Sequence, residues 1–169
     1  LAPDPRVPAL VETQPEFTTP IWDYLDSRIS AGRIERGKAA MARHAQLFAD
    51  IGRQYGVDPY LLGAIWGMET DYGAVLGNDS LIRPIVRSLA TVTWQRRSRF
   101  VEDKADFIAA LKLTAANGGR SPVGSWAGAI GHLQVNPSNV LAHGTDGDGD
   151  GRVDLHNSLA DALATSAAY

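Results

Sequence analysis

Hydrophobic and polar positions along the chain recur at the three- to four-residue spacing of amphipathic helices. The pattern begins at Ile21, where Trp22, Leu25 and Ile29 lie three and four residues apart. The longest stretch, 38–55, predicts one helix that stops at Gly56. Further helices are predicted over 59–72, 100–116 and 157–169, with a short helical piece after residue 137. No segment alternates convincingly as a strand, although a small β-hairpin within the loops stays open, so the predicted fold class is all-α.

The first 20 residues differ from the rest because they hold five of the nine prolines. Such a segment cannot be helical throughout, and we expect either an extended arm lying on the body or a loose tail. Residues 21–169 are predicted to form one domain, since a chain of 169 residues can bury about 70% of its unfolded surface around one core.

Composition narrows the class of protein. The formal net charge is −3, which argues against a dedicated nucleic-acid binder. The absence of cysteine excludes disulfides and thiolate metal sites. No apolar run reaches the ~18 residues of a transmembrane helix, so none is expected. No signal peptide is recognisable, and because the first residue is Leu1 we expect a processed chain.

The first candidate for chemistry is Glu69, near the end of the helix over 59–72. Leu62, Ile65, Trp66 and Glu69 share one face at helical spacing, so the carboxyl lies at the end of an apolar stripe. Partial desolvation there would raise its pKa and favour the protonated form that a general acid needs. A helix-end carboxylate that simply faces solvent is the open alternative.

Glu69 has no obvious partner carboxylate. Asp71 lies two residues further on and points to another side of the helix, and nothing ties Asp79, in a loop, to the site. Hydrolytic glycosidases usually place two carboxylates around the scissile bond. A lone glutamate fits a mechanism in which no water is activated.

The second candidate is the segment 146–157, in which aspartate and glycine alternate. Its spacing is that of an EF-hand-type loop, with Gly151 at the sixth position, where the chain must turn. Position 12 is Asn157 in place of the usual glutamate, so a bidentate ligand would have to come from the following helix. The predicted ligands are the side chains of Asp146, Asp148, Asp150 and Asp161 and the main-chain carbonyl of Arg152. An oxygen-only set predicts a structural Ca²⁺, with a solvated acidic turn as the alternative. A calcium sensor is disfavoured, because sensors normally pair two such loops.

Three motifs in register resemble the membrane-bound lytic murein transglycosylase B family. The run IWGMETDYG at 65–73 resembles the catalytic helix of that family, and SWAGAIGHLQVNPS at 125–138 resembles its second signature. The run DGRVDLHNSLADAL at 150–163 resembles its calcium loop and the helix after it. QPEFTTPIWDYLDSRIS at 14–30 resembles its amino-terminal part, so the resemblance covers most of the chain.

The resemblance implies a lysozyme-like, mostly helical fold and a periplasmic or cell-envelope enzyme, which we expect to be a monomer, acting on peptidoglycan strands. Glu69 would protonate the oxygen of the MurNAc–GlcNAc β-1,4 bond and then deprotonate the C6 hydroxyl of MurNAc, which closes a 1,6-anhydro ring. Ser125, Gln134 and Tyr169 match residues of the family's sugar groove, and we favour Trp126 for a further sugar contact.

The chain also departs from the pattern of this family. The substituted positions are His132, Leu133, Val135, Asn136 and Ala168. The family usually continues with further helices after the position of Tyr169, so we expect 21–169 to be a carboxy-terminally incomplete catalytic domain. Two alternatives stay open: a weakly active or inactive calcium-stabilised peptidoglycan-binding module, and a hydrolytic muramidase with a water-activating carboxylate.

Overall fold

The computed structural model describes residues 2–12, 19–96 and 100–169. Part of the motif at 14–30 therefore lies outside the described residues. The helices are α1 (Val7–Glu12), α2 (Ile21–Arg28), α3 (Ala31–Arg43), α4 (Ala45–Tyr55), α5 (Pro59–Thr70), α6 (Ile85–Gln95), α7 (Phe100–Ala116), α8 (Pro137–His143) and α9 (Leu159–Ala168). Two short strands, β1 (Arg83–Pro84) and β2 (Val123–Gly124), pair antiparallel.

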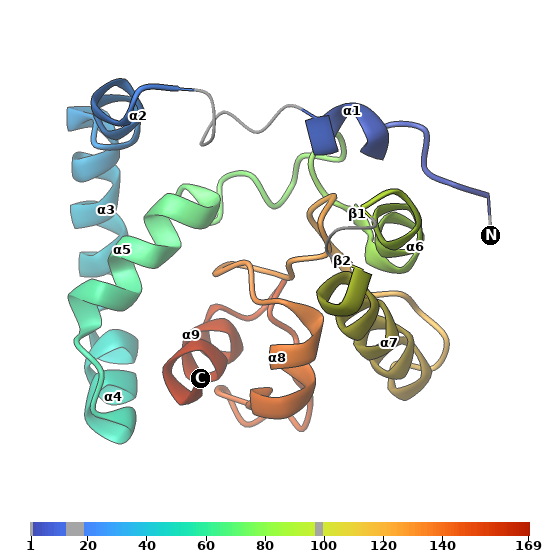
Figure 1. Ribbon diagram of the computed structural model, residues 1–169. Coiled ribbons are helices and arrows are strands. Elements are labelled where there is room, and N and C mark those ends of the chain that lie inside the picture. The colour runs from blue at the N-terminus through green and yellow to red at the C-terminus, as the bar shows by residue number, and fades with distance from the viewer. Residues whose placement is uncertain (1, 13–18, 97–99) are drawn as a thin grey trace.

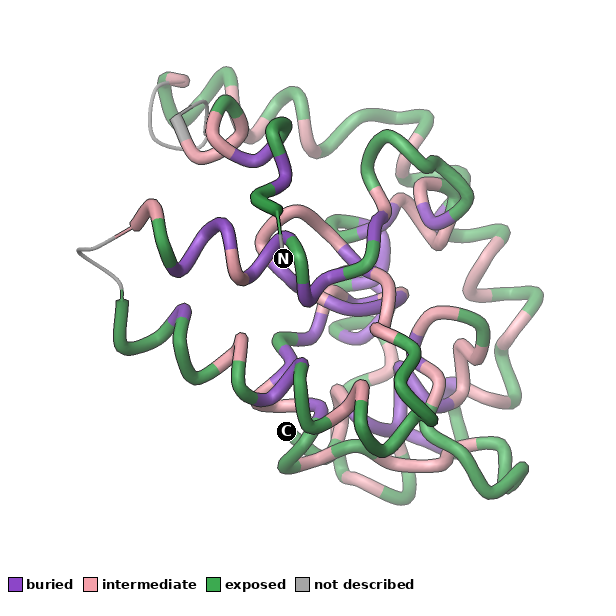
Figure 2. The backbone as a smooth tube through the Cα atoms, turned by 90° about the vertical axis from the view of Figure 1, so that its right-hand side faces the viewer, coloured by how far each residue is buried: buried purple, intermediate pink, exposed green. Residues whose placement is uncertain are grey.

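Helix α5 is the central element of the fold. It packs against α3 and α4 on one side and against α9 on another, and Figure 1 shows it running diagonally between the α2–α4 group and the α6–α9 group. Figure 2 shows buried backbone gathered mainly in the middle of the molecule, and the buried core includes residues of α4, α5, α6 and α9. None of the helices in the described parts of the chain is long and apolar enough to cross a bilayer.

The predicted helix over 38–55 is wrong in its boundaries. The chain forms two helices that meet at His44, which is the C-cap of α3 and the N-cap of α4. The two helices also differ in burial, because α3 buries only Gly37 whereas α4 buries Phe48 and Ile51. The break thus separates a surface helix from a core helix.

The predicted helix over 59–72 ends two residues early, at Thr70. Asp71 and Tyr72 both have left-handed backbone angles, with φ of 49° and 60°. Few non-glycine residues adopt this conformation, so it could not be predicted from the residue types at 71 and 72. The turn brings the Tyr72 hydroxyl against Gly67 and Gly37, at positions where a Cβ atom would collide with it.

Helix α6 was not predicted. Three of its buried residues are polar, namely Ser88, Thr91 and Thr93, so its buried face does not show in the sequence as a stripe of hydrophobic residues. Strands β1 and β2 are two residues long, too short to show alternation, and they join segments 40 residues apart in place of a hairpin.

The proline-rich arm, where it is described, lies on the body. Val7 in α1 is completely buried and α1 packs on α6. The main-chain N–H of Asp4 donates to Thr91 Oγ1 (2.9 Å). The Asp4 carboxylate accepts from Arg6 and lies 3.9 Å from the buried Arg83, and the hydrogen bond from Arg6 lowers the pKa of Asp4 to about 2.

Candidate active site

The helix that carries Glu69 begins with a strong cap. The Asp58 carboxylate accepts a hydrogen bond from the Tyr60 N–H (2.8 Å), and Pro59 occupies the first helical position. This fixes the register of the helix from its first turn, and with it the side on which Glu69 emerges.

Glu69 lies at the border between the buried and exposed faces of α5. Of its neighbours in the predicted stripe, Leu62 and Trp66 are 2% and 3% exposed, whereas Ile65 is 37% exposed. The stripe therefore has one buried edge and one open edge. Glu69, three residues after Trp66 and four after Ile65, sits between the two edges and is itself accessible.

The surroundings of Glu69 raise its pKa, as the sequence predicted. Partial desolvation by neighbouring protein is the larger cause, and the positive charge of Arg28, in the last turn of α2, opposes it. Solvent still reaches Glu69, so protein desolvates its carboxyl on one side only and the pKa is raised by that partial desolvation.

Asp71 is not available as a second catalytic carboxylate. Its Oδ1 accepts from Arg36 Nη2 at 2.8 Å and lies 3.6 Å from Arg33 Nε. These two cations hold the carboxylate in an ion-paired cluster with α3. The nearest carboxylate in sequence to Glu69 thus has a structural role.

The second signature, 125–138, folds into a set of tight turns beside β2. Gly124 bridges to Ile130, and Ile130 bridges to Val135, so this segment extends the β1–β2 pair. Ser125 closes the first turn, because its Oγ accepts from the Ala129 N–H (3.1 Å).

Gln134 belongs to the next turn, which spans 131–135. It has a left-handed φ of 51°, and its side-chain amide donates to the Gly131 carbonyl (2.9 Å). The turns thus give half-buried Ser125 and Gln134 defined positions in one compact unit.

His132 joins this unit to α5. Trp66 Nε1–H donates to His132 Nδ1 (3.0 Å), and Thr70 Oγ1–H donates to the His132 carbonyl (2.7 Å). Trp66 and Thr70 precede and follow Glu69 on the helix. The sequence motifs at 65–73 and 125–138 are therefore in direct contact. Nothing in the sequence pattern around His132 predicts this contact.

The other two predicted sugar-contacting residues are less closely tied to Glu69. Trp126 is half-buried, and the exposed Tyr169 ring packs against His143 of α8, with ring centres 5.4 Å apart. Among the described residues, no hydrogen bond or ring contact joins either side chain to α5. Their roles stay predictions.

The Asp-Gly loop brings three carboxylates together. Oxygen atoms of Asp146, Asp148 and Asp150 lie within 4.8 Å of one another. Main-chain N–H groups, above all that of Gly151 (2.8 Å), donate to Asp146 and lower its pKa. Three ionised oxygen donors at this spacing fit a hard cation such as Ca²⁺.

Asp161 fastens the loop to α9. It is 1% exposed, and its two oxygens accept from the Gly147 N–H (2.8 Å) and the Asp154 N–H (2.7 Å). Since it lies outside the cluster of three and already binds both arms of the loop, its place among metal ligands stays a prediction, as does that of the Arg152 carbonyl.

The mostly helical body built around α5 has the lysozyme-like fold of lytic transglycosylases. Comparison with known proteins agrees: the model of the family described as "Transglycosylase SLT domain" matches residues 1–169. The chain belongs to this family.

Relatives are known in two bacteria. Membrane-bound lytic murein transglycosylase B of Escherichia coli K12 is 26% identical over 148 residues, which is 86% of this chain and 40% of the relative. The crystal structure of SltB3 from Pseudomonas aeruginosa in complex with NAG-anhNAM-pentapeptide is 38% identical, with a TM-score of 0.87 over all of this chain and 44% of that one. The structure of Escherichia coli Slt35 in complex with calcium shares the fold at 23% identity, with a TM-score of 0.75 over 88% of this chain and 46% of that one. The chain thus spans less than half the length of each.

Proposed function

We propose that this chain is the catalytic part of a lytic transglycosylase of the bacterial cell envelope. Its substrate is the glycan strand of peptidoglycan, and the bond cleaved is the MurNAc–GlcNAc β-1,4 bond. Ser125, Gln134, Trp126 and Tyr169 contact the sugars. Family membership and the likeness to SltB3, which was crystallised with a 1,6-anhydro sugar, support the proposal.

The single observation that carries the mechanism is the isolation of Glu69. Its raised pKa keeps a larger share of the carboxyl protonated near neutrality, as donation to the glycosidic oxygen requires. The neighbouring Asp71 is held by two arginines and cannot activate a water. Among the described residues, Arg28 is the charge that acts on Glu69 and no carboxylate does so, which favours an internal nucleophile over hydrolysis.

The proposed reaction uses that carboxyl twice. Glu69 gives its proton to the bridging oxygen as the bond to MurNAc C1 breaks, and the GlcNAc product leaves with a hydroxyl. The carboxylate then takes the proton from the C6 hydroxyl of the same MurNAc while O6 bonds to C1. The acid is regenerated, the products are a 1,6-anhydroMurNAc end and a free GlcNAc end, and no water is consumed.

The test is mass spectrometry of the fragments that the protein releases from purified peptidoglycan. We expect fragments lighter by one water than hydrolysed muropeptides. Glu69→Gln should lower turnover by about 10³-fold, within the usual range for losing a general acid–base. The matched control is Glu35→Gln, which changes an exposed glutamate of α3 and should leave turnover unchanged. Reducing ends would identify a muramidase, and strand binding without release a binding module.

We also propose that the Asp-Gly loop binds Ca²⁺ in a structural role. The converging carboxylates support this, because without a cation three ionised groups so close would repel one another. A relative of the same fold was crystallised with calcium. The bound ion would neutralise the loop and hold it against α9.

The calcium proposal is tested by thermal unfolding and calorimetry. Added Ca²⁺ should raise the melting temperature and EDTA should lower it, since an ion that binds only the folded state stabilises by mass action. Asp148→Asn should abolish the response, whereas Asp79→Asn, outside the loop, should keep it. A midpoint that is the same in Ca²⁺ and EDTA would refute the site.

A further inference from the structure

His132 makes contacts with α5 through both its side chain and its main chain. The imidazole accepts from the Trp66 indole, and the carbonyl accepts from the Thr70 hydroxyl. These two donors stand three residues before and one residue after Glu69. We infer that His132 is a positioning residue, which sets the place of the turn at 131–135 relative to the Glu69 carboxyl. The inference rests on the proposed function.

The two bonds are shielded and reinforced. Thr70 is completely buried, and its hydroxyl oxygen also accepts from the Gly73 N–H (3.1 Å), so the end of α5 is fixed by the same group. Gly73, with φ of 85°, leaves the space that the imidazole fills, because a Cβ there would lie 2.8 Å from His132 Cε1. The space at Gly73 therefore fits the His132 ring. We call His132 with its two hydrogen-bond donors, Trp66 and Thr70, the clamp.

The chemistry of the pair fixes the state of the imidazole. An indole N–H can only donate, so Nδ1 must carry a lone pair, which assigns the neutral Nε2–H tautomer. Desolvation, followed by the nearby His156 and His44, lowers the pKa of His132 to about 4, against the opposing charge of Asp154. The acceptor is thus available throughout the neutral range.

The clamp also reaches the Asp-Gly segment. The His132 N–H donates to the Leu155 carbonyl (2.9 Å), and Gly131 packs directly on the same peptide group. One residue therefore connects the turn that carries Gln134, the helix that carries Glu69 and the end of the acidic loop. A shift of about 1 Å between reacting groups can cost up to 10²-fold in rate, so this connection bears directly on turnover.

The test compares His132→Leu, which cannot accept the indole bond, with His132→Gln, whose amide oxygen can. We expect His132→Leu to lower kcat by about 10- to 100-fold with little change in KM, and His132→Gln to recover much of the loss. In NMR spectra the Trp66 indole proton should move upfield in His132→Leu. Trp66→Phe keeps the ring and removes the donor, so adding His132→Leu to it should cost little more.

A readout without turnover separates this inference from the proposed function. The Glu69 carboxyl, followed by ¹³C NMR, should titrate differently in His132→Leu than in the wild type, because the last turn of α5, which carries Glu69, is no longer held at Trp66 and Thr70. Wild-type protein that releases no fragments would refute the function while this shift still supported the clamp. An unchanged Glu69 titration, or independent losses from the Trp66 and His132 variants, would overturn it.

Discussion

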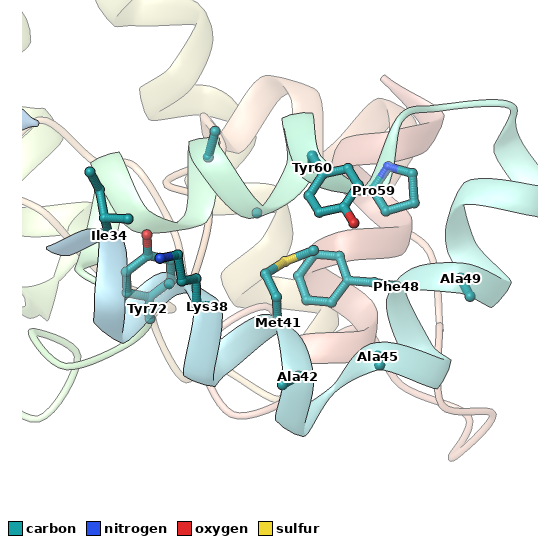
Figure 3. Close-up of a pocket in the computed structure, with 13 residues that line it drawn as sticks. Ile34, Lys38, Met41, Ala42, Ala45, Phe48, Ala49, Pro59, Tyr60 and Tyr72 are labelled. Atoms are coloured by element: carbon teal, nitrogen blue, oxygen red, sulfur yellow. The ribbon is translucent and has the colours of Figure 1, made fainter. Parts of the chain in front are cut away.

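Helix α5 has two borders between its buried and exposed faces, and the rest of the protein meets them in different ways. On the side of Glu69, Trp66 and Thr70 of the buried face hold a turn from the second half of the chain by hydrogen bonds of 3.0 and 2.7 Å. At the opposite border, Tyr60 and Ala64 face α3 and α4 across an apolar groove of about 650 Å³ (Figure 3). One border is joined by hydrogen bonds and the other by apolar contacts.

The second border is lined mainly by apolar side chains of the groove. Met41 and Phe48 form its floor, and a row of alanines widens it, namely Ala42, Ala45, Ala49 and Ala64. Apolar contacts have no preferred direction, so side chains here can shift without losing a specific partner. The hydrogen bonds that fix the position of α5 against the second half of the chain thus lie on the side of the helix where the chemistry is proposed.

The largest difference in unfolding free energy between the two borders should come from replacing one glycine at each border by alanine. Gly131→Ala places a Cβ against the Leu155 carbonyl, at a φ of 72° that disfavours any side chain. Gly63→Ala meets the sulfur of Met41, the mobile part of a flexible side chain. We expect losses of about 3 kcal/mol and at most about 1 kcal/mol, respectively, in the free energy of unfolding measured with urea. Equal losses would mean that the two borders are equally rigid.

The second effect is a dependence of stability on pH at the hydrogen-bonded border. The folded pKa of His132 is lowered to about 4 from its ordinary value of 6.5, so the folded state favours the neutral ring. The stabilisation is full above pH 6.5 and is lost as the pH falls towards 4. Allowing for the partial solvent access of His132, we expect a loss of roughly 1–2 kcal/mol.

Urea unfolding at pH 7 and pH 4.5 measures this loss in the wild type and in His132→Gln, which has no titrating group at this position. The variant should lose less stability than the wild type over the same interval. Asp4 does not interfere, because its pKa is lowered to about 2 from 3.8 and its contribution is lost only in stronger acid. If the unfolding free energies of the two proteins fell equally with pH, groups other than His132 would be the cause of the acid sensitivity.

The same contrast explains what could be predicted from the sequence. Helix α7 has the predicted bounds and α9 lies within two residues of its predicted start, because both have recognisable caps or stops and are largely local structures. Helical spacing predicted the raised pKa of Glu69 but not the open edge at Ile65. Helix α6 was missed because the polar residues Ser88, Thr91 and Thr93 occupy buried positions, which weakens the hydrophobic pattern.

The clamp could not be predicted for a different physical reason. It depends on left-handed turns at Tyr72 and Gln134, residues that rarely adopt that conformation, and on contacts between residues more than 60 positions apart. Ser125 and Gln134 are predicted as sugar-contacting residues from a resemblance; the structure places them in the turns, and their sugar contacts stay predictions. Spacing alone says nothing about such pairings.

The smallest effect should come from the apolar border, and it sharpens the comparison through a matched pair. Tyr60 is 77% exposed at the rim of the groove, and Ile65 is 37% exposed beside Glu69. Tyr60→Ala should change the unfolding free energy by less than about 0.5 kcal/mol, as for surface substitutions generally, and leave fragment release from peptidoglycan unchanged. Ile65→Ala should slow that release several-fold, because it lets water reach the Glu69 carboxyl and weakens the desolvation that raises its pKa. If Tyr60→Ala were the slower of the two, the groove between α3, α4 and α5 would have to be counted as part of the substrate path.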